Sequence, residues 1–391
     1  MGRDCIKPYS FYLFILFSIT YTQTEWTEVI IPDNQYIVKL VSDGNDLYGA
    51  TSAASIYFSP DNGLSWENLP IPPDIFPYGV DLFHKVDDYL FFNQNIGGST
   101  YNYRTYYNGA FWEDWQILPY DESIIYEFVH SDHIIYALLN QGISISYDYG
   151  SSWELIDAPE ITGYIHLQFA DSQYLYVNHG CNLYRYNIST EQWADITGVL
   201  DDIGPPEPYN CTSISQIEKF NGKLIISMYW YGGVGTLFYS EDHGDSWEII
   251  SSFPSVSNSG YGSNNVSAMT VKSGILYVGT ASSQDGIFYT HNLLDWIEYS
   301  VGLSSYNLSV SALAATEEKI YKLGGTVNLF QNDLAGALGD VNGDGILDVL
   351  DIIIIVSMIL EGEDSPSADV NGDGVLNVLD VVMCIEIILN A

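Results

Sequence analysis

The chain has 391 residues, of which 47% are hydrophobic, and its formal net charge is −39 at pH 7. A chain of this length can bury a substantial core and is expected to hold more than one domain. The negative charge repels DNA, RNA and anionic membranes, so it excludes nucleic-acid binding and favours cations or basic partners.

Residues 1–22 have the layout of a signal peptide. Arg3 and Lys7 precede an apolar run from Phe11 to Ile19, and small and polar residues follow the run. The run is too short to cross a bilayer, and no later stretch is both long and apolar enough to do so. The sequence therefore predicts an exported protein, secreted or attached to a cell surface, with no membrane-inserted segment.

Four cysteines are present, and Cys5 leaves with the predicted signal peptide. Two interpretations remain open for the other three. Either Cys181 and Cys211 form one disulfide, or both join Cys384 as small buried hydrophobic residues. Under either interpretation, disulfides are not the framework of the fold.

A repeat marked by tryptophan runs through residues 23–330. Three segments share the pattern Ser-x-Asp-x-Gly-x-Ser-Trp: SPDNGLSWENL, SYDYGSSWELI and SEDHGDSWEII. Weaker copies end at Trp193, at Trp296 and at either Trp112 or Trp115. An aspartate in a tight hairpin accepts backbone hydrogen bonds, glycine supplies a backbone angle that other residues avoid, and tryptophan buries a large ring between sheets. We therefore expect the aspartates of the pattern to stabilise turns rather than to catalyse a reaction: Asp61, Asp148 and Asp242.

Two strand-like runs precede each tryptophan hairpin, with alternating apolar residues broken by Gly, Asn and Asp. A seventh such unit begins near Ser309 but lacks its last strand, whereas TEWTEVII at residues 24–31 resembles a last strand without its predecessors. If this N-terminal strand completes the last sheet, the ring closes with seven blades of about 45 residues each. The six complete units begin near these positions: Ile37, Gly79, Tyr126, Ile165, Ser213 and Ser267.

Through its three strong repeats, this region resembles the Asp-box β-propellers of sialidases, xyloglucanases and sortilin-like receptors. The resemblance implies a mainly β, seven-bladed β-propeller, and it defines the fold more closely than the function. A sialidase mechanism is excluded, because sialidases hold the sugar carboxylate with three arginines and only Arg104 and Arg185 remain after the predicted signal peptide. Xyloglucanases of this type place paired carboxylates between two propellers, and this chain has room for one.

The inner strands of the predicted propeller offer one candidate catalytic site. Aligning the starts of the units places Asp81, Glu127 and His166 at one level on three neighbouring blades. Two carboxylates beside a histidine are suited to acid–base catalysis or to binding a cation or a sugar. The alternative is that these side chains line a wet channel or satisfy backbone groups.

Aromatic residues make up 15% of the chain and gather in two segments, STYNYRTYYNGAFWEDW and SMYWYGG. Exposed rings stack on the faces of sugars, and tyrosine hydroxyls bond to sugar hydroxyls. The alternative is that the rings suit β-strands and fill the gaps between blades. The candidates for ligand binding are Tyr106, Tyr107, Tyr229, Trp230 and Tyr231.

The C-terminal segment contains two copies of a calcium-type loop, GDVNGDGILDVLD and ADVNGDGVLNVLD. Such a loop supplies oxygen ligands from positions 1, 3, 5, 7, 9 and 12, with glycine at position 6 for the turn. The sequence therefore predicts two bound calcium ions, and the first loop, with one carboxylate more, is expected to bind more tightly. The first loop offers Asp340, Asn342, Asp344, the carbonyl of Ile346, Asp348 and Asp351. The second loop offers Asp369, Asn371, Asp373, the carbonyl of Val375, Asn377 and Asp380.

No helix is expected before either loop, position 12 is Asp where an ordinary EF-hand has Glu, and one apolar helix is expected after each loop. Residues 339–391 thereby resemble a dockerin, a small all-α calcium-dependent domain that binds cohesin modules. The resemblance implies partner contacts from loop positions 10 and 11, which here are Val349 and Leu350 in one copy and Val378 and Leu379 in the other. Their apolar character departs from the polar residues common in cellulosomal dockerins.

The two resemblances together predict a secreted calcium-binding dockerin protein associated with polysaccharide catabolism. A linker at residues 331–338 joins the dockerin, which docks to a cohesin-type partner, to a propeller that recognises a polysaccharide or a glycoprotein. Two alternatives remain. One is a glycoside hydrolase that acts on O-glycosyl compounds through the channel carboxylates, and the other is a non-catalytic structural or assembly propeller.

Overall fold

The computed structural model describes residues 25–390 apart from several segments, so the predicted signal peptide lies outside the described part of the chain. Within that range, the segments that are not described are 52–54, 70, 72–79, 97–98, 109–110, 119–124, 126, 140–141, 159–164, 198–210, 231–233, 255–265, 282–284, 326–328, 335–338, 342–346, 363–367 and 372–374.

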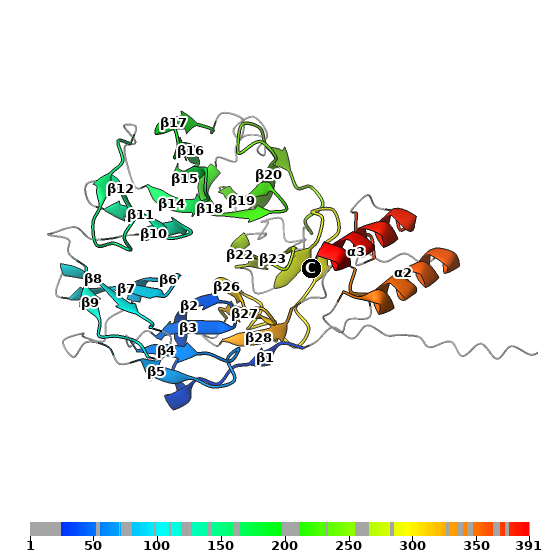
Figure 1. Ribbon diagram of the computed structural model, residues 1–391, viewed down its shortest axis with the longest axis horizontal. Coiled ribbons are helices and arrows are strands. Elements are labelled where there is room, and N and C mark those ends of the chain that lie inside the picture. The colour runs from blue at the N-terminus through cyan, green and yellow to red at the C-terminus, as the bar shows by residue number, and fades with distance from the viewer. Residues whose placement is uncertain are drawn as a thin grey trace, which may run out of the picture.

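The described strands form seven antiparallel four-stranded sheets, arranged as blades around a central axis (Figure 1). The innermost strand of each blade contacts the innermost strands of both neighbouring blades, so these strands form a continuous inner ring. The fold is therefore a mainly β, seven-bladed propeller, as predicted. The innermost strands are β2 (Ile37–Asp43), β6 (Val80–Val86), β10 (Glu127–Ser131), β14 (His166–Ala170), β18 (Cys211–Phe220), β22 (Val266–Lys272) and β26 (Ala312–Ala315).

The other three strands of each blade follow outward in the same order. The second strands are β3 (Asp46–Thr51), β7 (Tyr89–Ile96), β11 (Ile134–Leu139), β15 (Tyr174–His179), β19 (Lys223–Trp230), β23 (Ile275–Thr280) and β27 (Lys319–Leu323). The third strands are β4 (Ile56–Ser59), β8 (Ser99–Tyr106), β12 (Gly142–Ser146), β16 (Asn182–Asn187), β20 (Val234–Ser240), β24 (Ile287–Thr290) and β28 (Phe330–Asp333). The outermost strands are β5 (Glu67–Leu69), β9 (Gln116–Ile117), β13 (Glu154–Leu155), β17 (Gln192–Asp195), β21 (Glu248–Ile249), β25 (Ile297–Glu298) and β1 (Thr27–Glu28).

The N-terminal strand closes the ring. β1 pairs antiparallel with β28, with Thr27 opposite Gln331 and Glu28 opposite Phe330, so the last sheet has the order β1-β28-β27-β26. This pairing confirms that the first strand of the chain completes the seventh blade. The propeller extends to Asp333, beyond the predicted boundary at residue 330, because the pairing of β28 with β27 continues to that residue.

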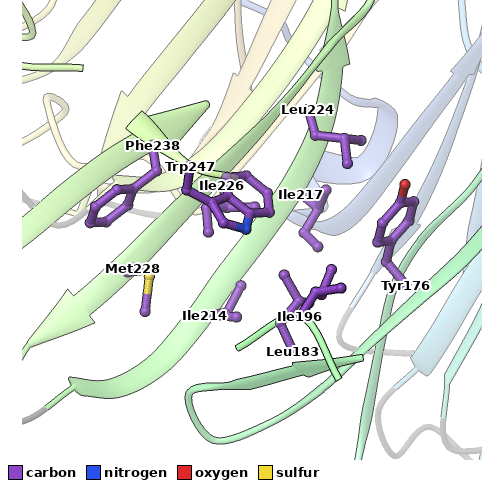
Figure 2. Close-up of a cluster of buried hydrophobic side chains, with 10 residues drawn as sticks. All are labelled: Tyr176, Leu183, Ile196, Ile214, Ile217, Leu224, Ile226, Met228, Phe238 and Trp247. Carbon is purple, nitrogen blue, oxygen red and sulfur yellow. The ribbon is translucent and has the colours of Figure 1, made fainter. Parts of the chain in front are cut away.

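The hydrophobic core lies between neighbouring blades. Figure 2 shows one cluster in which Tyr176, Leu183 and Ile196 of the β14–β17 blade pack against side chains of the next blade, including Trp247. Similar buried clusters lie at the other blade contacts. Burying one large apolar side chain contributes about 1.5–3 kcal/mol, so contacts between blades supply much of the stability of the ring.

The Ser-x-Asp-x-Gly-x-Ser-Trp segments form turns between the third and outermost strands of three blades. In the first turn, Asp61 accepts hydrogen bonds from the Ser59 hydroxyl at 2.9 Å and from the Ser65 backbone N–H at 2.8 Å and hydroxyl at 2.6 Å. The same bonds recur at Asp148 and Asp242. Burial raises the pKa of each carboxyl, but these hydrogen bonds outweigh it and leave the pKa lowered. The three aspartates thus act as charged caps of their turns.

Glycine and tryptophan have distinct tasks in these turns. Gly63, Gly150 and Gly244 have φ angles of 75°, 80° and 96°, in the left-handed region that glycine enters without strain. A Cβ atom on Gly244 would lie 2.6 Å from the Cδ1 atom of Ile196 in the preceding blade, so glycine also permits a close approach between blades. Trp247 then joins the interblade cluster of Figure 2.

Cys181 is disulfide-bonded, which favours the disulfide interpretation over three reduced cysteines. The carbonyl of Gly180 accepts a hydrogen bond of 3.3 Å from the N–H of Ile214 in β18. The loop that carries Cys181 therefore lies against the strand that begins at Cys211. Cys384, in contrast, is a buried free thiol.

The C-terminal segment folds into two helices, α2 (Val349–Glu361) and α3 (Val378–Asn390), which lie side by side (Figure 1). Each has 13 residues, and among the described residues no helix has the length and hydropathy needed to cross a membrane. A small core holds the pair together, and its fully buried members are Val341, Ile355, Ala368, Val370 and Cys384.

Candidate functional site

The first calcium-type loop is tied to the start of α2 by its last carboxylate. Asp351, which is fully buried, accepts hydrogen bonds from the N–H groups of Val341 at 3.0 Å and Asp348 at 2.9 Å. Asp348 caps the helix by accepting from the N–H of Leu350 at 2.7 Å. Asp340, at position 1, is also buried. These bonds tie position 12 of the loop to the backbone at positions 2 and 9.

The second loop has a similar arrangement at the start of α3, with one donor at position 3 of the loop instead of position 2. Asp380 is fully buried and accepts hydrogen bonds from the N–H groups of Asn371 at 3.1 Å and Asn377 at 2.7 Å. Asn377 in turn accepts from the N–H of Leu379 at 2.8 Å, as Asp348 does from Leu350. Asp369, at position 1, is buried like its counterpart in the first loop. The two loops are therefore structural as well as sequence repeats.

The donor set fits a hard divalent cation. Residues 339–391 contain eleven Asp and Glu residues and no Lys, Arg or His, so the buried carboxylates have no cationic side chain within this segment to offset them. All predicted ligands are oxygen atoms, which calcium prefers. Within the described part, Asp340, Asp348, Asp351, Asp369, Asn371, Val375, Asn377 and Asp380 lie in the two loops. The remaining predicted ligands, Asn342, Asp344, Ile346 and Asp373, lie outside the described residues.

Residues of both loops pack against the same small core between α2 and α3. Gly339, at the start of the first loop, has a φ of 93°, and a Cβ atom there would lie 2.9 Å from Leu347 and 3.0 Å from the sulfur of Cys384 in α3. Burial, followed by the nearby carboxylates of Asp380 and Asp351, raises the pKa of the Cys384 thiol to about 11. The last carboxylates of both loops thus lie near the thiol of Cys384.

Both helices present an exposed apolar stripe at matching positions. Val349 and Leu350 are 63% and 56% exposed, and Val378 and Leu379 are 65% and 56% exposed. The predicted partner-binding residues are thus at the surface. Each stripe extends further than loop positions 10 and 11 along its helix, at the i+4 and i+7 spacing of one helix face. The additional members are Ile353 and Val356 on α2 and Val382 and Ile385 on α3.

The propeller brings two of the three channel candidates together. The Nδ1 atom of His166 lies 2.7 Å from Oε1 of Glu127, and both side chains are partly exposed. The Oε2 atom of Glu127 accepts a hydrogen bond of 2.9 Å from the N–H of Leu167. The side chain of Asp81 lies outside the described residues, although its backbone lies in β6.

The bond to Leu167 gives Glu127 a role in joining blades. Gln216, at the matching position two blades further on, accepts from the N–H of Met269 at 2.7 Å and donates to its carbonyl at 2.9 Å. Both side chains therefore hold the innermost strand of the following blade. This arrangement favours the interpretation that Glu127 satisfies backbone groups. Glu127 and His166 nevertheless form a partly exposed carboxylate–histidine pair at the inner ring.

The aromatic candidates that the structure describes pack inside the propeller. The ring centroid of Tyr106 lies 5.0 Å from that of Tyr89, and the ring centroid of Tyr107 lies 5.1 Å from that of Trp112, both pairs tilted. Both tyrosines are half-buried, which favours the alternative that they fill gaps between strands and blades. The side chains of Tyr229 and Trp230, and the whole of Tyr231, lie outside the described residues.

Comparison with protein families matches residues 338–389 to the Dockerin type I domain. The C-terminal segment is therefore a dockerin type I domain, as its loops predict. Dockerin type I domains bind calcium, they dock to cohesins, and proteins that carry them are typically extracellular and associated with cell surfaces. No curated protein matches the chain.

Several solved structures share the propeller. YCF48 bound to D1 peptide is 13% identical with a TM-score of 0.58, over 81% of this chain and 96% of that one. YCF48 from Cyanidioschyzon merolae is 13% identical with a TM-score of 0.54, over 79% and 98%. The GH74 xyloglucanase from Xanthomonas campestris is 15% identical with a TM-score of 0.54, over 80% and 54%. This chain thus spans about half of that enzyme, and at such identities the likeness shows the fold alone.

Proposed function

We propose that this chain is a secreted calcium-binding protein whose dockerin docks to a cohesin module and whose propeller recognises a polysaccharide or a glycoprotein. The docking half is carried by the two equivalent apolar stripes, each of which begins at a calcium-type loop. The likeness of the propeller to a GH74 xyloglucanase supports the glycan half.

Two calcium ions, one in each loop, would make docking dependent on the metal. Without calcium, the eleven acidic residues of the segment repel one another with no basic residue to offset them. Calcium neutralises the loop carboxylates and holds each helix start in place, so part of the binding free energy of the ion stabilises the fold. The apolar stripes are then presented on ordered helices, where burying them against a partner is favourable.

A binding experiment tests the docking half. The mature chain, residues 23–391, is titrated calorimetrically against a panel of cohesin modules, in calcium and again in excess chelator. We expect binding to at least one cohesin in calcium and none in chelator. Failure of every cohesin to bind in calcium, or equal binding in chelator, would overturn the proposed docking.

Glycan recognition is tested separately on the same protein. A glycan array shows binding, and release of reducing sugars from the bound polysaccharides shows hydrolysis. Binding without release supports recognition. Release supports the alternative of a glycoside hydrolase, and the absence of both supports a structural or assembly propeller.

The hydrolase alternative is favoured by one observation, the Glu127–His166 pair at 2.7 Å. A glycosidase also needs a second carboxylate about 5–10 Å away, and Asp81 on the neighbouring blade is the candidate for it. If the activity exists, an Asp81→Ala/Glu127→Ala double variant should lose it. Sugar release that persists in this variant would remove the channel carboxylates from the mechanism.

A further inference from the structure

A hollow of about 430 Å³ lies where the seventh blade crosses over to the first. We call it the crossover hollow, because its wall runs from β1 through the 3-10 turn η1 (Pro32–Asn34) to the start of β2. Volumes of about 300–1,000 Å³ are usual for sites that bind small ligands or short segments of a polymer. The hollow lies at the end of the ring where innermost strands begin, as do Glu127 and His166.

The crossover hollow has an apolar floor and a polar rim. Its floor consists of buried aliphatic side chains that belong to the core between the seventh and first blades, among them Val29, Ile31 and Leu329. At its rim lie Glu28 and Asn34, both exposed, and the ring of Tyr36, which is 54% exposed. In the described part of the chain, Tyr36 takes part in neither a hydrogen bond nor a ring contact.

The backbone of this rim is strained. Asp33 and Asn34 are consecutive residues other than glycine with φ angles of 60° and 52°. Left-handed residues of this kind cost roughly 1 kcal/mol or more each and cluster at functional sites. The turn is fixed by the N–H of Gln35, which donates to the carbonyl of Pro32 at 3.3 Å. Asn34 and Tyr36, with Gln35 between them, line the same hollow.

We infer that the crossover hollow binds a segment of a neutral polysaccharide. The exposed ring of Tyr36 offers a face for a sugar ring, and the amide of Asn34 offers a donor and an acceptor for hydroxyl groups. Among the described residues that line the hollow, none is Lys, Arg or His, so they offer an anionic ligand no counter-charge. A single carboxylate provides little to hold a basic peptide. This inference rests on the proposed recognition of glycans and names its site.

The test uses matched exposed tyrosines. Tyr36→Ala removes the ring from the hollow, Tyr36→Phe keeps the ring without its hydroxyl, and Tyr147→Ala removes a ring that is 53% exposed in another blade. The mature calcium-loaded protein is tested by affinity electrophoresis in xyloglucan, xylan, mixed-linkage glucan and galactomannan. We expect Tyr36→Ala to weaken binding roughly 10-fold, the gain typical of an aromatic contact. Tyr36→Phe and Tyr147→Ala should stay close to the unmodified protein.

The outcomes separate this inference from the proposed function. If the unmodified protein binds one of these polysaccharides and Tyr36→Ala binds equally well, the crossover hollow is not the site, while glycan recognition stands. Equal weakening by Tyr147→Ala would also overturn the assignment of the site. If the unmodified protein binds none of the four, recognition of neutral polysaccharide fails and the inference fails with it. Melting temperatures of all variants establish that each is folded.

Discussion

The hydroxyl of Tyr321 donates a hydrogen bond of 2.7 Å to the backbone carbonyl of Asn62, 259 positions away in the sequence. Tyr321 lies in β27 of the last blade, and Asn62 lies in the Ser-x-Asp turn of the first, so the bond joins the blades at which the ring closes. Tyr176 makes a longer bond of the same kind, 3.4 Å, to the carbonyl of His243 in the next blade. Asn62 and His243 are both left-handed, with φ angles of 56° and 60°. The turn of one blade thus offers a carbonyl to the blade before it.

Removing this hydroxyl should loosen the closure of the ring. We expect Tyr321→Phe to lower the free energy of unfolding by about 1–2 kcal/mol, because the buried carbonyl of Asn62 loses its donor. Tyr136→Phe is the matched control. Tyr136 occupies the corresponding position of another blade and is also fully buried, but its hydroxyl has no hydrogen-bond partner among the described residues. Urea denaturation of the two variants provides the comparison, and equal losses would show that the bond at the closure contributes nothing.

The sequence predicts the blades well because each blade is specified locally. The Ser-x-Asp-x-Gly turns, the alternating strands and the tryptophan hairpins recur at regular intervals, and the unpaired strand of β1 fits the only unit that lacks one. The bond from Tyr321 to Asn62 could not be predicted, because the contact between two repeat positions of different blades depends on how the whole blades pack.

The candidate sites also differ in whether local sequence or three-dimensional packing determines them. The expected calcium ligands follow from fixed spacing within one loop, so each could be proposed from the sequence. Glu127 and His166 could be placed side by side from the alignment of the inner strands, but the second bond of Glu127, to the backbone of Leu167, depends on three-dimensional geometry. Tyr36 carried no sequence pattern at all. It became a candidate only because the structure leaves its ring exposed at the rim of a hollow.

Removing calcium should unfold the dockerin and leave the propeller folded. The dockerin core is small, and its carboxylates are crowded without basic residues, whereas the ring is held by large interblade clusters. We expect excess chelator to reduce the helical circular dichroism signal and to expose residues 339–391 to protease, while a fragment corresponding to residues 23–333 remains resistant. A helical signal and protease resistance that do not change in chelator would contradict a metal-dependent fold.

The two loops should differ in affinity for calcium. The first loop offers four carboxylates and the second offers three, because position 9 is Asp348 in one and Asn377 in the other. More ligand charge generally tightens calcium binding. Asp351→Asn and Asp380→Asn weaken one loop each at the same position, so calorimetry on the two variants reports the loop that remains. We expect tighter binding in Asp380→Asn, and the reverse order would refute the argument from charge.

The matching stripes on α2 and α3 should allow two binding orientations, in which either α2 or α3 makes the main contact with a cohesin. Leu350 and Leu379 occupy corresponding positions and are both 56% exposed. We expect Leu350→Asp or Leu379→Asp alone to change the affinity by only a few-fold, because the other stripe remains. The double variant should lose at least ~100-fold, since each orientation then buries a charge. Calorimetry with a cohesin that binds the unmodified chain measures all three. A single variant that abolishes binding would show that one orientation dominates.

A buried lysine should make the stability of the propeller depend on pH. Lys322 in β27 is fully buried, and its ammonium group donates to the carbonyls of Asn307 and, at 3.2 Å, Ser309. Burial lowers its pKa from 10.5 to about 8. Between these two values the folded chain has released the proton and the unfolded chain still holds it. The free energy of unfolding should therefore rise as the pH increases from 8 towards 10.5.

Lys322→Met isolates this contribution, because every other titrating group is shared with the unmodified protein. We expect the stability of the unmodified protein relative to Lys322→Met to increase by up to about 2 kcal/mol between pH 8 and pH 10. This is an upper limit, because the carbonyls that accept from the charged form offset part of its burial. Urea denaturation at pH 7, 8, 9 and 10 measures the difference. A difference that stays constant across this range would mean that these carbonyls keep the ammonium group at its ordinary pKa.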